Sequence, residues 1–203
     1  MKRILTLVLL CFSFTFMGQN FHTEFNYTDS TNNGITIQNS YPKGGLSYTD
    51  FDGKKYVYVI FWTSITNKTK SEIELTIDFP ITTFGIQSSP SINFQLYLPF
   101  QKMTFEKDSL FNYGLDINMF FNNKENKRSS LRTTIAKNET YNFYIVLLNS
   151  QGINGIVRTG FELEHQNLIY KINGQQMNCG TIVPKKIKYK FTSTFLQLTF
   201  SFS

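Results

Sequence analysis

Short runs of alternating apolar and polar residues recur along this chain, and they are the feature that most restricts its fold. In residues 71–79 the two kinds of side chain alternate strictly, as in a strand with one buried face and one face in water. Residues 56–62 are apolar at every position, which predicts a central strand covered on both faces. Clusters of Asn, Gly, Asp and Lys separate these runs and predict turns.

The pattern predicts an all-β fold of about nine or ten strands. One short helical turn is expected at residues 108–114, where Asp108 is a suitable N-cap and Gly114 a suitable C-terminal residue. Residues 122–128 are polar and predict an exposed loop within the same domain. Besides residues 71–79, the strands are expected at residues 34–38, 46–51, 54–62, 92–98, 115–121, 141–148, 160–165 and 168–172.

The sequence Asp50-Phe51-Asp52-Gly53 suggests either half of a calcium-binding loop or the turn of a hairpin. Two strand-like segments flank Asp52-Gly53, and Asp-Gly is a favoured type I′ turn in a two-residue hairpin loop. A calcium loop needs further carboxylates downstream, whereas two lysines follow at once and repel a cation. We therefore predict a hairpin turn without bound calcium, and a second one at Asn173-Gly174.

The first residues have the layout of a signal peptide, because a charged start precedes fourteen uncharged residues, 4–17, and then Gly18. A membrane-spanning helix needs about 20 apolar residues, which is more than this run supplies. We expect cleavage after Gly18 and a mature chain that starts at Gln19. The predicted organisation is a signal peptide (1–18), a flexible start of the mature chain (19–32), a β domain (33–183), and a basic linker with a C-terminal strand (184–203).

The charge balance bears on the partner and the compartment. The formal net charge is +6, and loss of Lys2 and Arg3 with the leader lowers it to +4. Elsewhere acidic and basic residues alternate, without the dense basic stripe of a nucleic-acid-binding surface. We expect export to the periplasm or the cell surface and no nucleic-acid partner. The remaining excess comes mostly from Lys185, Lys186, Lys188 and Lys190.

Few residues are candidates for catalysis. Cys179 is the one cysteine in the expected mature chain, and without a basic neighbour its thiol is expected to be inert. Two histidines, His22 and His165, are too few for a histidine metal cluster, and we expect His165 to end a strand. Glu162 and Glu164 share one face of a predicted strand about 6.6 Å apart, whereas glycosidase carboxylates normally come from separate elements. We interpret them as a solvated face, with Arg158 as an ion-pair partner.

The segment Pro42-Lys43-Gly44-Gly45 is the best candidate for a binding loop, because glycines beside a lysine are able to surround an anion. A phosphate-binding loop leads into a helix, but these glycines lead into a strand. The segment predicts a turn or bulge, with a loop that contacts a ligand as the alternative. No catalytic, cofactor-binding or metal-binding residue is assigned, and no cofactor is expected.

In the final segment, residues 195–203, apolar and polar residues alternate strictly from Leu196 onwards. Outer-membrane barrels end in such strands, but this chain ends in Ser203, and most upstream strands are shorter than the roughly 9 to 11 residues that cross a bilayer. We expect the segment either to complete the folded domain or to associate with a membrane or partner. The alternating apolar face consists of Leu196, Leu198, Phe200 and Phe202.

Two segments resemble a known family. The first is an apolar strand that ends in Ile65-Thr66-Asn67, followed by a polar turn and a second alternating strand; the second is a turn with Glu139 before a strand marked by Phe143 and Val146. They are similar to the immunoglobulin-like sandwiches of exported bacterial proteins, including the telokin-like group of uncharacterised domains. The chain has Lys137-Asn138 where that group often has Pro-Gly. The resemblance covers residues 55–172 and implies an immunoglobulin-like antiparallel β-sandwich with a non-catalytic role.

The sequence thus predicts an exported, non-catalytic binding or structural module of the cell envelope. Its expected partner is an unknown protein or envelope component. A small outer-membrane barrel and a secreted hydrolase are the alternative functions.

Overall fold

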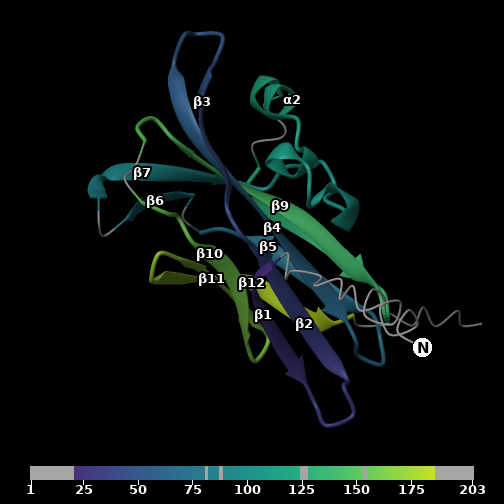
Figure 1. Cartoon of the computed structure of the whole chain (residues 1–203). Coiled ribbons are helices and arrows are strands. Elements are labelled where there is room, and N and C mark those ends of the chain that lie inside the picture. Colours follow the sequence, from purple (N-terminus) through teal and green to yellow (C-terminus); the bar gives the residue numbers. More distant parts are fainter. Residues whose placement is uncertain (1–20, 81, 87–88, 124–127, 153–154, 186–203) are drawn as a thin grey trace, which may run out of the picture.

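A computed structural model of the chain describes residues 21–80, 82–86, 89–123, 128–152 and 155–185. It confirms an all-β fold of two antiparallel sheets, and it has twelve strands rather than the nine or ten predicted (Figure 1). The larger, seven-stranded sheet has the order β1 (Phe21–Thr28), β2 (Gly34–Ser40), β4 (Lys55–Asn67), β9 (Thr140–Asn149), β7 (Ser89–Tyr97) and β6 (Thr83–Ile86), and β3 (Lys43–Thr49) also pairs with β4. The smaller sheet has the order β10 (Thr159–Glu164), β11 (Asn167–Ile172), β12 (Gln175–Pro184), β5 (Ile73–Asp78) and β8 (Ser130–Ile135).

The long strand β4 organises the larger sheet. Its second half pairs with β2 and its first half with β3, because Tyr41 and Pro42 interrupt what is otherwise one partner strand. Alternate β4 side chains point to opposite faces. Phe61 and Ile65 enter the core between the sheets, while Trp62 lies in a second core on the outer face. The predicted strand with two covered faces is therefore confirmed.

A helical segment between β7 and β8 covers this outer face (Figure 1). It contains two 3₁₀ turns, η1 (Phe105–Lys107) and η2 (Phe111–Gly114), and the helix α2 (Ile117–Asn122). The turn expected at residues 108–114 is present in part as η2, in which Asn112 and Tyr113 have left-handed φ of 52° and 54°. The predicted N-cap, Asp108, is wrong, because Leu110 precedes the turn and no side chain caps it. The second core joins Tyr58, Ile60, Trp62, Tyr144, Val146 and Leu148 of the sheet to Met103, Tyr113, Leu115, Phe120 and Phe121 of the segment.

The strand predicted at residues 115–121 is wrong, since most of it is helix α2. The carboxylate of Asp116 accepts a hydrogen bond from the Met119 N–H at 2.9 Å and caps the helix. Ile117, Phe120 and Phe121 have the spacing of one helix face and pack on the second core. The period of two was misleading because Leu115, Ile117 and Met119 alternate with Asp116 and Asn118, whereas in the helix Met119 is exposed.

Four strands lie outside the predicted segments: β1, β6, β8 and β12. The expected flexible start of the mature chain is wrong for β1, which pairs with β2 along its whole length. Strand β8 was missed because only Leu131 and Ile135 of its six residues are apolar and buried. The predicted signal peptide, residues 124–127 of the predicted loop and the predicted C-terminal strand lie outside the described residues.

Both predicted hairpins are present, and they differ in loop length. Asn173-Gly174 forms a two-residue loop with positive φ at both positions, as a type I′ turn requires. The first hairpin has three loop residues, 51–53, and its two-residue prediction is wrong. Asp50 causes the difference, because its Oδ1 accepts hydrogen bonds from the N–H groups of Asp52 at 3.0 Å and Lys54 at 2.8 Å.

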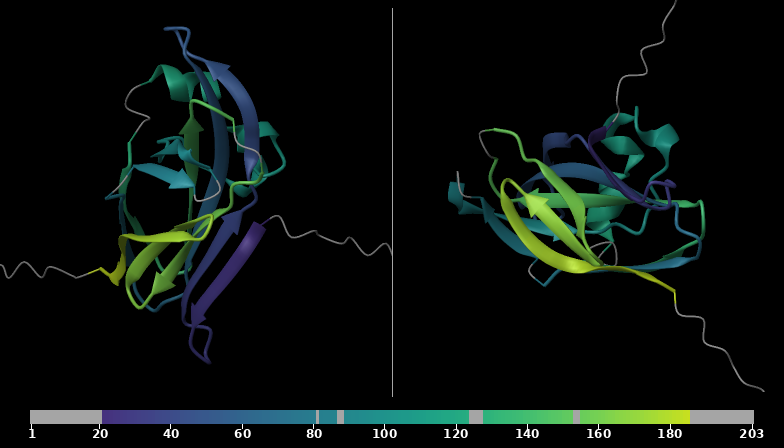
Figure 2. Two further views of the ribbon diagram at one scale, coloured as in Figure 1. Left: turned by 90° about the vertical axis from the view of Figure 1, so that its left-hand side faces the viewer. Right: turned by 90° about the horizontal axis from the view of Figure 1, so that it is seen from below.

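Figure 2 shows the two sheets from two further sides. Two buried asparagines connect separate parts of this fold. Asn67 joins the β4–β5 loop to the β8–β9 loop, since its Nδ2 donates to the carbonyls of Ser71, Ile135 and Ala136 at 2.9–3.1 Å. Asn39 of β2 joins the two sheets through the backbone N–H and C=O of Phe161 in β10. Among the described residues, no helix is long and apolar enough to span a membrane.

Candidate functional site

The residues first considered for catalysis are not brought together. Cys179 is buried, and its thiol donates to the Leu168 carbonyl at 3.3 Å. Burial raises the thiol pKa to about 12, so the reactive thiolate is suppressed near neutral pH. Glu162 forms an ion pair with Lys171 at 2.8 Å rather than with Arg158. His165 lies at an exposed hairpin turn with φ 61°, and the His22 ring packs edge-on against Tyr41.

The segment Pro42-Lys43-Gly44-Gly45 forms the predicted bulge at the start of β3. Gly44 and Gly45 have φ of 113° and 74°, which side chains rarely tolerate. The Lys43 ammonium is engaged within the protein and is not free to bind an anion. It donates to the carbonyls of Asp108 and Leu110 and lies 4.0 Å from the Tyr113 ring centroid. Lys43 therefore attaches the helical segment to β3, and burial lowers its pKa.

Two cavities lie near the end of β9. The two strands β7 and β9 pair only from Gln95 to Tyr97, so the first part of β7 extends beyond the end of β9. An apolar cavity of about 270 Å³ lies partly under the bulge and is bordered by Gly44, Val57, Phe94 and Val157. The predicted binding loop thus borders a cavity, although its lysine nitrogen is engaged elsewhere.

A second cavity, which we call the polar groove, has a volume of about 280 Å³. Lys54 and Leu148 border this groove, and so does Asn149, the last residue of β9. Asn149 is 3% exposed, and its Nδ2 has no hydrogen-bond partner among the described residues. Its Oδ1 accepts from the Gln151 N–H at 2.8 Å. Tyr56, Thr83, Asn93 and Gln95 also border the groove.

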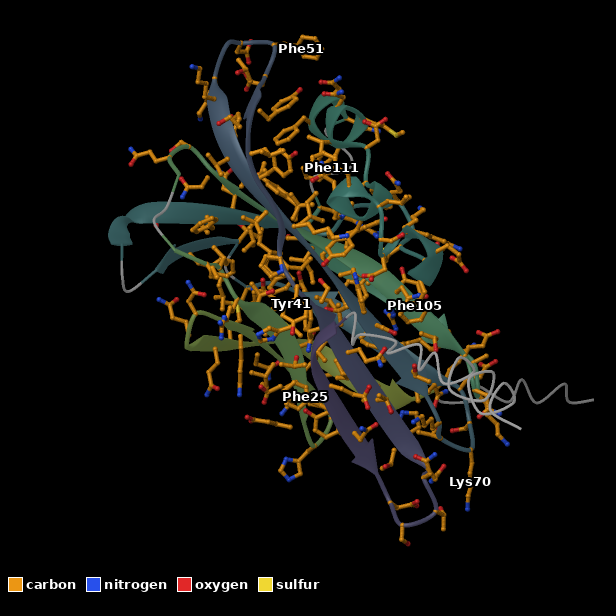
Figure 3. The ribbon with its side chains drawn as sticks, viewed as in Figure 1. Phe25, Tyr41, Phe51, Lys70, Phe105 and Phe111 are labelled. Atoms are coloured by element: carbon orange, nitrogen blue, oxygen red, sulfur yellow. The ribbon has the colours of Figure 1, made fainter. Side chains whose placement is uncertain are left out.

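The helical segment and the start of β3 expose large apolar side chains (Figure 3). We call these five residues the apolar surface; their exposed fractions lie between 47% and 72%. η2 lies against β3, and the Tyr113 hydroxyl donates to the Tyr41 carbonyl at 2.6 Å. The apolar surface consists of Tyr41, Leu46, Phe105, Leu110 and Phe111.

The backbone beneath the apolar surface is held by buried polar contacts. Trp62 Nε1 donates to the Asp108 carboxylate at 2.7 Å, and its ring contacts Phe105 edge-on at 5.7 Å. The Tyr144 hydroxyl donates to the Tyr113 carbonyl at 2.6 Å. Burial raises the pKa of the Tyr113 and Tyr144 hydroxyls to about 12, so both hydroxyls remain protonated hydrogen-bond donors. The exposed side chains are therefore presented by a fixed support.

Sequence reasoning missed both the apolar surface and the polar groove. A signal for the first exists, because residues 100–121 contain more aromatic side chains than a short turn buries. The groove has no comparable signal, since its residues come from four strands. Within the described part of the chain, no group of three His, Cys, Asp or Glu side chains is placed to hold a metal ion.

The arrangement offers surfaces for binding. The chain matches no family model, no curated protein and no solved structure.

Proposed function

We propose that this protein is an exported, non-catalytic binding module of the cell envelope that docks a protein partner through the apolar surface. The observation that carries the proposal is the set of exposed Phe, Tyr and Leu side chains on a rigidly held segment. Monomeric proteins rarely expose large contiguous apolar patches unless these serve an interaction. Aromatic side chains are also enriched at protein interfaces, where rigid anchors contribute most of the binding energy.

The charges around the apolar surface favour a protein over a lipid membrane. Residues 99–123 contain two lysines and three acidic residues. Lys43, at its edge, donates to carbonyls inside the protein. A helix or loop that binds anionic lipid usually carries several free cations, which supply much of the attraction. A partner with a complementary apolar pocket and a mixed polar rim suits this surface better.

Export is the second part of the proposal and rests on the charged start, the uncharged run and Gly18. The test is fractionation of cells that express the full chain, with sequencing of the mature N-terminus. We expect a mature chain that starts near Gln19 in the envelope or extracellular fraction. Recovery of exported protein that retains Met1 would contradict cleavage, and recovery from the cytoplasm alone would contradict export.

We also propose that the sandwich is immunoglobulin-like and related to the telokin-like group. The two segments that carry the resemblance lie together, because Asn67 of the first contacts Ala136 beside the second. The Asn67 N–H also donates to the Glu139 carbonyl at 2.9 Å. An experimental structure tests this class, and a different connection between the two sheets would overturn it.

Site-specific photo-crosslinking tests the docking surface. A photoreactive phenylalanine analogue at Phe111 should give a discrete crosslinked species of defined mass in intact cells. The control position is Lys70, which is exposed and lies far from Phe111 (Figure 3). With the photoreactive analogue placed at Tyr41 instead, the Phe111→Ser variant should lose the crosslink and keep its unfolding midpoint, since the Phe111 side chain is 72% exposed. Equal crosslinks at Phe111 and Lys70, or none at Phe111, would refute the proposal.

A further inference from the structure

The smaller sheet has two edge strands, β10 and β8, and they differ in how their backbone groups are used. At the outer edge of β10, the side chain of Asn39 bonds to both the N–H and the C=O of Phe161. The Leu163 N–H on the same edge donates to the Tyr27 hydroxyl. Strand β8, in contrast, pairs with β5 alone. An edge strand with free backbone groups is a site at which another strand is able to pair.

The hydrogen-bond pattern of β8 shows which of its backbone groups are free. The Phe79 N–H donates to the Ser129 carbonyl at 3.2 Å, and this pair continues the β5–β8 register. Hydrogen-bonded pairs alternate along an antiparallel ladder, so the odd-numbered residues of β8 bond to β5 and the even-numbered residues point away from it. The backbone groups of Ser130, Arg132 and Thr134 therefore face outward, and they have no partner among the described residues.

The side chains of β8 leave this edge open. Natural edge strands are often protected by charged side chains or by proline. Arg132 is the one charged residue of β8, and its guanidinium bonds to the Glu74 carboxylate of β5 at 2.7 Å. The charge is therefore directed along the sheet towards β5 rather than over the free edge. All three residues with outward-facing backbone groups are exposed.

The core face beside β8 is incompletely covered. Leu131 and Ile135 of β8 are buried in the core between the sheets. The turn 136–139 leads directly from β8 to β9, so the start of β9 lies near the end of β8 in the opposite sheet. Tyr141 of β9 projects from the core face, like its partner Ile65, but it is only half-buried. A strand added to β8 gains this surface for packing.

We propose that the outer edge of β8 binds residues 196–202 of the same chain as a sixth antiparallel strand of the smaller sheet. Residues opposite each other in neighbouring strands share a face of the sheet. The alternation of residues 196–202 thus places the apolar side chains beside the buried positions of β8 and the polar ones beside its exposed positions. In the register that brings Leu196 opposite Ile135, Gln197 lies opposite Thr134.

The length of the connecting segment suits this arrangement. The Lys185 N–H donates to the Glu72 carbonyl at 2.9 Å, and the next residue of β5, Ile73, pairs with Ile135. The chain therefore leaves β12 at the end of the sheet where β8 also ends, and a strand that enters there runs antiparallel to β8. The far side of β8 is three strand spacings away, about 14 Å. The segment 186–195 extends over as much as about 33 Å.

The free edge of β1 is the competing acceptor within the chain. The Asp29 N–H donates to the Asn33 carbonyl in the β1–β2 register, so by the same alternation the backbone of Asn26 faces outward. However, β10 already meets β1 at the Tyr27 hydroxyl, and β10 is the last strand of the smaller sheet on that side. An apolar strand added to β1 would lie beyond the smaller sheet and leave its apolar face uncovered.

Disulfide formation in the full chain with Cys11→Ser tests the acceptor edge. The variant Thr134→Cys, Gln197→Cys places two thiols opposite each other on the exposed face of the sheet, and Thr134→Cys, Thr199→Cys does so if the register shifts by two residues. Cys179 is buried and does not compete. On oxidation with copper phenanthroline, one of these pairs should form an intramolecular disulfide.

Two control pairs separate this arrangement from its alternatives. Thr134→Cys, Leu198→Cys puts the thiols on opposite faces of the sheet, and Asn26→Cys, Gln197→Cys tests the edge of β1. The better β8 pair should react at least about tenfold faster than either control, because strand pairing holds its thiols at a high effective concentration.

Hydrogen exchange provides a readout that needs no added thiol. The amides of Arg132 and Thr134 should exchange at least about tenfold more slowly in the unmodified chain than in Leu198→Asp, Phe200→Asp, because the added strand protects them. The amide of Leu131 faces β5 and should exchange alike in both proteins. If the double variant does not fold, the disulfide pairs decide the matter.

Four results would overturn the proposal. They are a β1 pair that reacts as fast as the β8 pairs, equal reaction of the Leu198 pair, disulfide-linked dimers as the main product of the β8 pairs, and unchanged exchange at Arg132 and Thr134 in a folded double variant.

Discussion

Three buried asparagines have different roles at the level of single residues. Asn67 is saturated, because its Oδ1 accepts from the N–H and the hydroxyl of Thr69 while its Nδ2 donates to three carbonyls. Asn39 likewise makes four side-chain hydrogen bonds. Asn149, in contrast, has an unpaired Nδ2. Two of these amides therefore stabilise the fold, and the third has a buried donor without a partner among the described residues.

Asn67→Ala should lower the free energy of unfolding by about 2 to 4 kcal/mol, since it leaves several buried backbone carbonyls without donors. Urea unfolding followed by tryptophan fluorescence measures the change. Asn118→Ala is the control, because Asn118 is exposed on α2 and should change the stability by at most about 0.5 kcal/mol. Similar values for the two variants would contradict the connecting role of Asn67.

One thiol and two tyrosine hydroxyls, all with raised pKa values, predict that the protein loses stability at alkaline pH. Burial raises the pKa of Cys179 from 9.0, and those of Tyr113 and Tyr144 from 10.0, to about 12 in each case. The unfolded chain therefore releases these protons at lower pH than the folded chain. The stabilisation is complete below about pH 9 and decreases as the pH rises towards 12.

The urea midpoint should consequently be lower at about pH 10.5 than at about pH 7.5. Cys179→Ala removes the acid with the lowest ordinary pKa, so its stability should fall less steeply between pH 9 and 10. A urea midpoint that stays constant as the pH rises would show that Cys179, Tyr113 and Tyr144 have the same pKa values in the folded and the unfolded chain.

At the level of elements, the helical segment was the hardest part to predict. Its residues 115–121 satisfy the strand period and the helix period together, and only the cap at Asp116 and the covered face of β4 decide between them. Strand β5, which alternates cleanly, and strand β9, which contains a continuous apolar run at residues 143–148, were predicted nearly to their observed bounds. The polar edge strand β8 and the short β6 lacked a periodic signal strong enough to identify them.

Lys43→Met should loosen the helical segment without unfolding the sheets, because the variant loses both carbonyl contacts and the contact with the Tyr113 ring. Trypsin cleavage after Lys102 and Lys107, followed by mass spectrometry, should become several-fold faster, since cleavage follows local opening. Lys55→Met, an exposed lysine at the start of β4, is the matched control. Equal cleavage in the two variants would contradict the anchoring role of Lys43.

At the level of the molecule, hydrogen bonds from side chains, rather than backbone-to-backbone hydrogen bonds, join the two sheets along one edge. Asn39 occupies the outward N–H and C=O of Phe161, and the Tyr27 hydroxyl accepts from the Leu163 N–H at 2.9 Å. The outer edge of β10 is thereby protected from pairing with another chain. The sequence predicts strands with one covered face and strands with two. It does not predict this link between the sheets, because Asn39 and Phe161 lie 122 positions apart.

Asn39→Ala should lower the free energy of unfolding by about 2 to 4 kcal/mol and also expose the β10 edge. Chemical unfolding measures the first effect, and light scattering during incubation measures the second. Asn118→Ala again provides the comparison, with neither effect expected. Destabilisation without any increase in scattering would leave the energetic role intact and refute the protection of the edge.

The pairing of β4 with β9 has a consequence for the order in which the protein forms during synthesis. Thr66 pairs with Thr140 and Val57 with Asn149, so the centre of the larger sheet cannot close until residue 149 has left the ribosome. Sheets that depend on such distant partners form slowly, on the order of milliseconds to seconds. A chain with the proposed leader would thus reach the translocation machinery unfolded, and its two sheets would form after the chain has crossed the membrane.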